Sequence, residues 1–204
     1  MTARPLTLDD IVDLRAYERE RDSLRKAVIT EKKVRRVTVE PVVTLTFESR
    51  TTVRFQVQEM ARAEQLTTDE RVQHELDVYN RLLPAPGELS ATLFLELTSE
   101  EQLRDWLPKL VGVERAAVLV IGEGAAMHAV RSVPEGDHEE QLTRDDVTSA
   151  VHYVRFPFTP AEVTAFAAGP VTLMINHPGY PEGRPGVVLS DATRAALTGD
   201  LTTL

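Results

Sequence analysis

Residues 43–97 constrain the fold of this chain more than any other stretch, because they combine the spacing typical of strands with that typical of helices. Apolar side chains alternate with polar ones over 43–47 and again at Val53 and Phe55, with a polar break between the two runs. Period-2 alternation is typical of strands that bury one face, and a break of about four or five residues is typical of a hairpin loop. The pattern therefore predicts a hairpin over residues 43–55.

Two helices and a further strand are predicted to follow. Residues 56–65 are rich in strong helix formers. Thr68 offers an N-cap for a second helix, which has one apolar face and which Pro84 ends. Residues 93–97 are substantially apolar on both faces, as expected of an interior strand. The apolar face of the second helix is predicted from Val72, Leu76, Tyr79 and Leu83, which recur at helical spacing.

The rest of the chain predicts an α+β fold with a mainly antiparallel sheet and helices packed on it. A charged helix is expected after a capping-box-like start at Thr7 and Asp10, and a short strand near Val37 and Val39. A helix shortened by Pro108 and a second hairpin over 116–130 should follow. The two hairpins argue against a doubly wound parallel sheet. Later elements are expected at 149–158 as a strand, at 160–167 as a helix and at 171–175 as a strand.

The length of the chain suits one large domain or two small ones, and we favour a single α+β domain over residues 1–180. The polar, acidic segment 134–146 is expected to be a mobile loop. Residues 181–204 contain several prolines and glycines before a possible last helix near 191–197. We expect this segment to be a C-terminal extension that is extended and partly mobile.

Charge and cysteine content narrow the classes of function. The net charge of −9 and the pI near 5.1 argue against a general attraction to nucleic acid or to an anionic membrane. The chain lacks a run of about 18 apolar residues and an apolar signal core, so we expect a soluble protein of the cytoplasm. With no cysteine, this chain cannot ligate zinc or an iron–sulfur cluster through thiolates.

Three residues are the candidates for a metal site. Glu59 and Glu75 lie on the two central predicted helices, and His152 lies on a later predicted strand. Carboxylate oxygen together with imidazole nitrogen suits manganese, iron or zinc. Their spacing is not that of the diiron helical bundles, in which Glu and His are three residues apart. The alternative interpretation is structural: exposed carboxylates, ion pairs between helices and one hydrogen-bonded histidine.

Three other features have residue types that are used in catalysis or in binding anions. Ser90 is not followed two residues later by the glycine of a nucleophile elbow. Residues 122–124, Gly-Glu-Gly, lack the further glycine and the lysine of a phosphate-binding loop. The basic cluster Lys32, Lys33, Arg35 and Arg36 is typical of a solvated helix, and the alternative is a site for phosphate or for an acidic partner.

Several segments together resemble a bacterial protein family of unknown function. They are QVQEMARAE, ELDVYN and PGELSATLFLEL, with YERERDSLR before them and SAVHYVRFPFT after them, and the resemblance extends from about residue 6 to about residue 180. Genes of this family often neighbour those of rubrerythrin and of an iron–sulfur oxidoreductase of the heterodisulfide-reductase type. The resemblance therefore implies a setting in redox or peroxide metabolism, and it supplies no catalytic residues.

Two functional hypotheses from different classes follow. The first is a non-enzymatic accessory or interaction protein of a cytoplasmic redox or peroxide-related system, with an iron–sulfur oxidoreductase or a rubrerythrin-like protein as its partner. The absence of cysteine and the family resemblance favour it. The alternative is a small metal-dependent enzyme or metal-binding protein that uses carboxylate and histidine ligands. A stoichiometric transition metal in the purified protein would favour this alternative.

Overall fold

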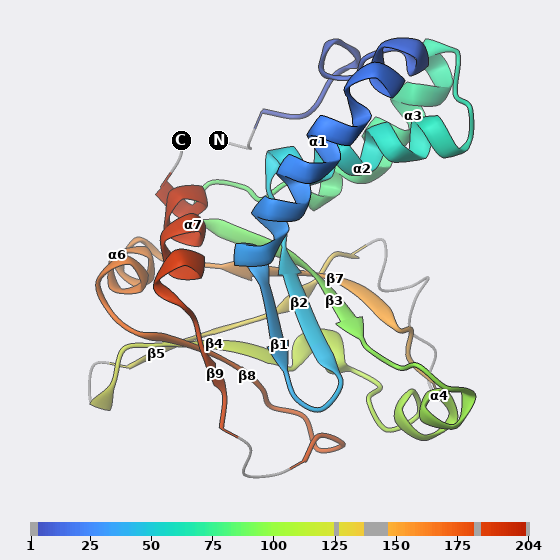
Figure 1. Ribbon diagram of the computed structural model, residues 1–204. Helices are drawn as coiled ribbons and strands as arrows, with labels where there is room; N and C mark the ends of the chain where they lie inside the picture. The colour runs from blue at the N-terminus through green and yellow to red at the C-terminus, as the bar shows by residue number, and fades with distance from the viewer. Residues whose placement is uncertain (1–3, 125–126, 137–146, 182–184, 203–204) are drawn as a thin grey trace.

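Two antiparallel sheets form the centre of the computed structural model, which describes residues 4–124, 127–136, 147–181 and 185–202 (Figure 1). The first sheet has the strand order β1-β2-β3-β7-β6 and the second has the order β5-β4-β8-β9. Every strand pair is antiparallel. The predicted α+β class with mainly antiparallel pairing is therefore confirmed, with two sheets in place of one.

The first sheet begins with a hairpin of β1 (Arg36–Val39) and β2 (Val43–Phe47). The predicted strand at Val37 and Val39 is confirmed, whereas the predicted hairpin over residues 43–55 is wrong. The polar break after β2 is a helix start: Ser49 accepts a hydrogen bond from the Thr52 backbone N–H, and α2 (Arg50–Ala63) follows. A serine with this geometry satisfies a free N–H at a helix N-terminus, so the chain leaves the sheet there.

The interior of the first sheet is β3 (Glu88–Leu95), which pairs with β2 on one side and with β7 (Val151–Pro157) on the other. The predicted interior position of this strand is confirmed. Beyond β7 the sheet ends at the two-residue β6 (Val133–Pro134).

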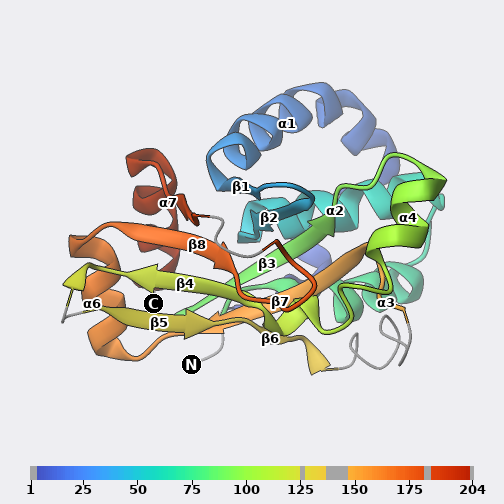
Figure 2. The same cartoon turned by 90° about the horizontal axis from the view of Figure 1, so that it is seen from below.

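The second sheet contains the predicted hairpin of residues 116–130, formed by β4 (Ala117–Ile121) and β5 (His128–Arg131). On its other side β4 pairs with β8 (Val171–Ile175), and β8 pairs with the short β9 (Val187–Val188). Figure 2 shows this sheet lying across the first one.

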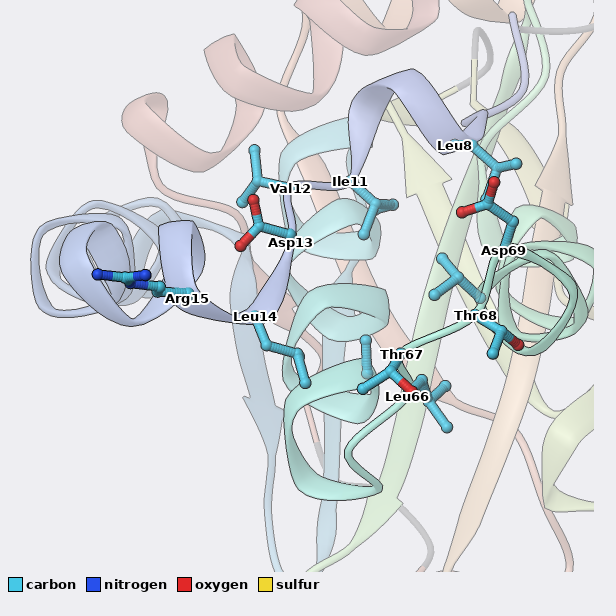
Figure 3. Close-up of a pocket in the computed structure, with 12 residues that line it drawn as sticks. Leu8, Ile11, Val12, Asp13, Leu14, Arg15, Leu66, Thr67, Thr68 and Asp69 are labelled. Atoms are coloured by element: carbon cyan, nitrogen blue, oxygen red, sulfur yellow. The ribbon is translucent and has the colours of Figure 1, made fainter.

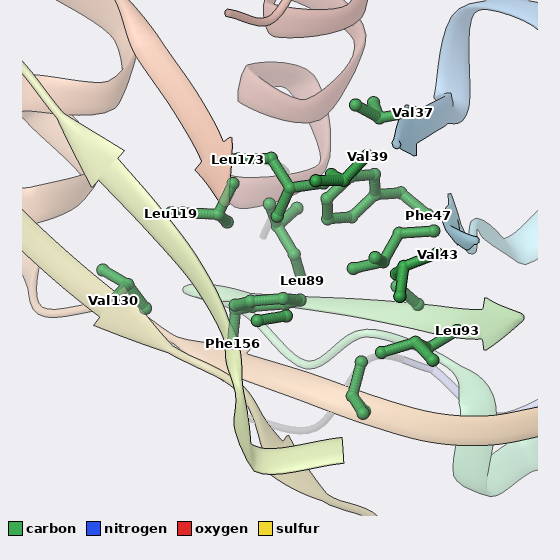
Figure 4. Close-up of a cluster of buried hydrophobic side chains, with 14 of the residues drawn as sticks. Val37, Val39, Val43, Phe47, Leu89, Leu93, Leu119, Val130, Phe156 and Leu173 are labelled. Carbon is green, nitrogen blue, oxygen red and sulfur yellow. The ribbon is translucent and has the colours of Figure 1, made fainter. Parts of the chain in front are cut away.

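The main hydrophobic core lies between the two sheets (Figure 4). Because strand side chains alternate, one face of β2 directs Val43, Leu45 and Phe47 into this core. Phe47 meets Phe156 of β7 with their ring centroids 5.9 Å apart. The second sheet contributes further apolar side chains from β4, β5 and β8, namely Leu119, Ile121, Val130, Val171 and Leu173.

A second, smaller cluster packs under α2 and α3 (Asp69–Tyr79) on the other face of the first sheet. Val53 and Val57 of α2 are four residues apart, so they point the same way and meet Leu76 of α3 in this cluster. The predicted helix at Thr68 and its apolar face are therefore confirmed. Figure 1 shows α2 and α3 beside the long α1 (Leu14–Arg35), which is capped by Asp13 and starts later than the predicted capping box at Thr7 and Asp10.

The remaining helices are α4, α6 and α7. α4 (Glu100–Trp106) ends just before Pro108, as predicted. α6 (Pro160–Ala168) and α7 (Asp191–Thr202) lie side by side (Figure 1), and Leu197 and Leu201 of α7 belong to the main core. The possible last helix near 191–197 is therefore confirmed as α7, which continues to Thr202. The predicted loop 134–146 falls largely outside the described residues. Among the helices of the described residues, none is long and apolar enough to cross a membrane.

Candidate functional site

The three predicted metal ligands do not share a site in this structure. In the described part of the chain, no three His, Asp or Glu side chains lie close enough together to hold a metal ion. The orientation of His152 is one reason why it does not meet Glu59 and Glu75. His152 pairs with Leu93 in the β3–β7 ladder and points toward the second sheet, whereas Tyr153 contacts the cluster under α2 and α3. His152 and the two central helices therefore lie on opposite faces of the first sheet.

Glu59 joins α1 to α2. Arg21 binds both of its carboxylate oxygens, at 2.8 Å each, and the Tyr17 hydroxyl donates to Oε1 at 2.7 Å. Chiefly because of the Arg21 hydrogen bonds, the pKa of Glu59 falls from 4.5 to about 2. Glu59 is thus a structural carboxylate between two helices. The arginine that neutralises it is Arg21, whereas the neighbouring Arg62 bonds Glu18.

Glu75 lies half-buried on α3 near Tyr79. The pKa of the Tyr79 phenol is raised, first by burial and then by the negative charge of Glu75. Ser90, considered for its residue type, and the nearby Asn80 both have structural contacts. Ser90 donates to the Leu82 carbonyl at 2.6 Å, and the Asn80 side chain bonds the backbone of Leu6 in both directions. These hydrogen bonds tie the connections around α3 to the sheet and to the N-terminal segment.

The carboxylate that faces His152 is Glu114, which the sequence did not single out. Glu114 lies on a 3₁₀ helix at Val113–Arg115 that packs against β6 and β7. Its Oε2 is 3.9 Å from His152 Nδ1, and the two side chains are 4% and 3% exposed, respectively. The other ring nitrogen of His152, Nε2, lies 2.9 Å from both the Thr148 hydroxyl and the Ser149 carbonyl oxygen. Burial lowers the pKa of His152, and the charge of Glu114 opposes this shift only in part.

The hydrogen bonds of His152 fix its neutral tautomer. The Ser149 carbonyl oxygen can only accept, so Nε2 carries the proton and Nδ1 presents a lone pair. This lone pair faces Glu114 Oε2, which has no hydrogen-bond donor among the described residues. The two atoms are 3.9 Å apart, too far for a direct hydrogen bond, so the pair is a buried contact between a carboxylate and an imidazole.

A second buried carboxylate, Glu48, is fully satisfied. The hydroxyls of Thr52 and Thr92 donate to its two oxygens at 2.5 and 2.6 Å, which links α2 to β3. Nearby, Arg35 binds Asp200 of α7 at 2.5 Å and Glu31 at 3.1 Å. Arg36 pairs with Glu96. Two members of the predicted basic cluster are therefore engaged within the fold, and Lys32 and Lys33 remain as candidates for a partner.

A pocket of about 380 Å³ lies where the N-terminal segment and the starts of α1 and α3 meet the end of α2 (Figure 3). Its apolar lining comes chiefly from Leu8, Ile11, Leu14 and Val72. Arg15 also borders the pocket, and Figure 3 shows its guanidinium pointing away along the outside of α1. The pocket therefore adjoins the exposed face of α1.

That exposed face carries a line of basic side chains, Arg15, Arg19, Lys26 and Lys33, hereafter the α1 basic face. Their spacings are close to whole helical turns, so they project from one side of the helix. Tyr17 and Val28, both 1% exposed, mark the opposite, buried side. None of the four basic residues forms an ion pair with another described residue. Asp22 lies within the same line, and Ile29, which is 45% exposed, lies beside it.

Comparisons with known proteins agree with the fold and give no activity. A family model described as "Protein of unknown function (DUF3501)" matches residues 5–201. The chain is also similar to a protein of unknown function from Burkholderia pseudomallei K96243, known from a crystal structure. The two are 35% identical with a TM-score of 0.86, over 98% of this chain and 100% of that one. No curated protein matches the chain.

Proposed function

The chain belongs to DUF3501, a family of proteins of unknown function, and from this family setting and the surface of α1 we propose a non-enzymatic accessory role. In this proposal it is an interaction protein of a cytoplasmic redox or peroxide-related system. The observation that carries the proposal is the α1 basic face, a line of exposed cations in a chain whose net charge is −9.

The charge pattern determines the kind of partner. Exposed cations that form no ion pair with another described residue are available to an acidic surface, and complementary charges increase the association rate. Nucleic acid is a poor candidate because the rest of this acidic chain would repel its phosphates. Ile29 and the adjoining pocket add apolar contact area beside the charges, and anchoring in a pocket is where binding energy concentrates at interfaces. We therefore expect a protein partner that has acidic side chains around a protruding apolar one.

The partner class comes from the family resemblance: an iron–sulfur oxidoreductase or a rubrerythrin-like protein. Because the chain has no cysteine, any iron–sulfur cluster in the complex would have its cysteine ligands in the partner. The accessory role is then to hold or orient the redox protein.

Co-purification from the native host at endogenous expression level tests this proposal. The wild-type chain should recover one of the two partner classes at low salt, and recovery should fall as salt screens the charges. The variant Arg19→Glu/Lys26→Glu, which reverses two charges of the α1 basic face, should recover at least tenfold less partner. Its circular dichroism spectrum should be unchanged because both side chains are exposed.

The matched control reverses two exposed arginines on other helices, Arg71→Glu on α3 and Arg104→Glu on α4. This control changes the net charge by the same amount, so equal losses in both variants would show a general charge effect and not a docking face. Recovery of neither partner class by the wild-type chain would contradict the proposal.

A further inference from the structure

The outward side of α1 has the residue spacing of a contact line between two packed helices. Six exposed side chains recur alternately four and three residues apart, which is the spacing that keeps side chains facing a neighbouring helix. At a rise of about 1.5 Å per residue, this line extends for about 27 Å. Its members are Arg15, Arg19, Asp22, Lys26, Ile29 and Lys33.

The rest of the fold holds α1 from its opposite side. The Tyr17 hydroxyl donates to Glu59 of α2 near one end of the helix, and Arg35 binds Asp200 of α7 at the other end. The elements that α1 chiefly contacts are α2, α7 and β2. Figure 2 shows α1 on the outside of the molecule. The outward line is therefore available to another protein along the length of the helix.

Small side chains follow one flank of this line. Ser23, Ala27 and Thr30 are all exposed there, and the Thr30 hydroxyl donates to the Lys26 carbonyl of its own helix. Packed helices lie about 8–10 Å apart, at a distance set by the side chains between them. Small residues on the flank let a second helix come close, while the long arginine and lysine side chains reach its charged groups.

Resting on the accessory role proposed above, we propose that the α1 basic face binds an acidic α-helix of the partner, which lies along α1. The four cations of this face form no ion pair with another described residue, and Asp22 is the one carboxylate in the line. A second helix has the same rise as α1, so acidic residues repeating every three or four positions stay opposite the cations along the whole line. Side chains on one face of a strand repeat every 6.6 Å or so and fall out of step with helical turns of about 5.4 Å.

The acidic helix comes from a different protein and not from a second copy of this chain. Two copies of α1 packed through this line would bring like charges together, which is unfavourable. The next-longest helix of the described residues is α2, which has 14 residues against the 22 of α1. The described part of this chain therefore offers no acidic helix that matches the full length of the line.

Photo-crosslinking followed by peptide mapping tests the shape of the partner. A photoreactive phenylalanine analogue replaces Asp22 in one full-length protein and Ile29 in another, seven residues or about two turns further along α1. Leu103 on α4 is the control position. In the native host, the two α1 positions should attach to residues about seven apart in one continuous partner segment, which carries acidic side chains three and four residues apart.

That mapped segment, synthesised as a labelled peptide, gives the second measurement. Fluorescence anisotropy should show saturable binding to the wild-type chain. A proline in the middle of the peptide keeps its charge and breaks its helix, and it should weaken binding at least tenfold. Arg19→Glu/Lys26→Glu should weaken binding of the unbroken peptide by a similar factor, whereas Arg71→Glu/Arg104→Glu should change it less than threefold.

The outcomes separate this inference from the accessory role. Adducts in distant partner segments, or equal binding of the two peptides, would overturn the helix while the partner still co-purifies. Adducts between two copies of this chain, or none at either α1 position while the partner co-purifies, would also overturn it. Failure of any partner to co-purify would contradict the accessory role itself, and the acidic helix with it.

Discussion

Replacing Glu59 by glutamine should separate its structural role from the metal-binding role that the sequence allowed. Glu59→Gln keeps the side-chain volume and the acceptor for Tyr17, and it removes the charge that holds Arg21 in two parallel hydrogen bonds. Hydrogen bonds to charged groups contribute about 1.5–3 kcal/mol. The Glu59 and Arg21 side chains are 28% and 23% exposed, so solvent screening reduces this contribution. We expect a loss of about 1–2 kcal/mol in the free energy of unfolding at pH 7.

The lowered pKa of Glu59 determines how the stability difference between the wild type and Glu59→Gln changes with pH. The folded-state pKa of Glu59 is about 2, below its ordinary value of 4.5, so the unfolded chain binds the proton more readily. The stabilisation is fully present above the unfolded pKa and is lost as pH falls toward the folded one. The wild-type and Glu59→Gln proteins should therefore differ most at pH 5–7 and should converge as pH falls below about 4.

Urea unfolding followed by circular dichroism measures this difference. With typical slopes of about 1–3 kcal/mol per molar, the predicted loss corresponds to a midpoint shift on the order of 0.5–1 M urea. Glu75→Gln on α3 is the matched control and should shift the midpoint by less than half as much. A Glu59→Gln shift that persists unchanged at pH 3, or one that a chelator reproduces in the wild type, would refute the ion-pair explanation.

Three further changes test other parts of the structure. Leu197→Ala removes a buried side chain of α7 from the main core, and calorimetry should show a loss of about 2–5 kcal/mol; a loss below about 1 kcal/mol would mean that α7 is not docked there. Asp200→Asn leaves the buried Arg35 with a weakened partner and should cost about 2–4 kcal/mol in urea unfolding, more than Asp191→Asn at an exposed ion pair. Thr67→Trp should fill the pocket beside α1 and lower partner recovery while unfolding stays unchanged; unimpaired recovery would remove the pocket from the docking surface.

Periodicity predicted most of the fold, because the buried faces in this chain are regular. The apolar face from Val72 to Tyr79 forms α3, and the second hairpin forms β4 and β5. The hairpin over residues 43–55 failed because Val53 and Val57 satisfy helical spacing as well as Val53 and Phe55 satisfy strand spacing. The N-cap at Ser49 starts helix α2 in place of a hairpin loop. A serine in a polar break fits a helix N-cap and a hairpin loop equally well, so the sequence alone discriminates poorly between them.

The C-terminal helix shows a different limit of sequence reasoning. Its glycines and prolines upstream suggested an extended segment, but Leu197 and Leu201 complete the main core between two sheets whose pairing no local pattern reveals. The strands form two facing sheets and not one. Which strands join which sheet depends on contacts between residues far apart in the chain.

The sequence pointed to one residue of the buried Glu114–His152 pair and missed the other. His152 was noticed because of its residue type, but its partner was sought on the helices and not on the short turn before β4. Glu114 did carry a signal, since it is a lone carboxylate within a largely apolar run from Leu110 to Ile121. A charged residue in such a run is buried when the run is packed, and it then needs a partner. The strand parity of His152 fixed which face of the sheet it occupies, but only the structure shows what lies opposite.

Photo-crosslinking in living cells of the native host tests the accessory role most directly. A photoreactive phenylalanine analogue at Ile29 lies beside the α1 basic face, and the same analogue at Leu103 on α4 is a control with similar exposure, 37% against 45%. The account predicts that Ile29 gives one dominant adduct with an iron–sulfur oxidoreductase or a rubrerythrin-like protein, that Leu103 does not, and that Arg19→Glu/Lys26→Glu abolishes it. No adduct at Ile29, or the same adducts at both positions, would contradict the central claim that α1 is the surface through which this protein acts.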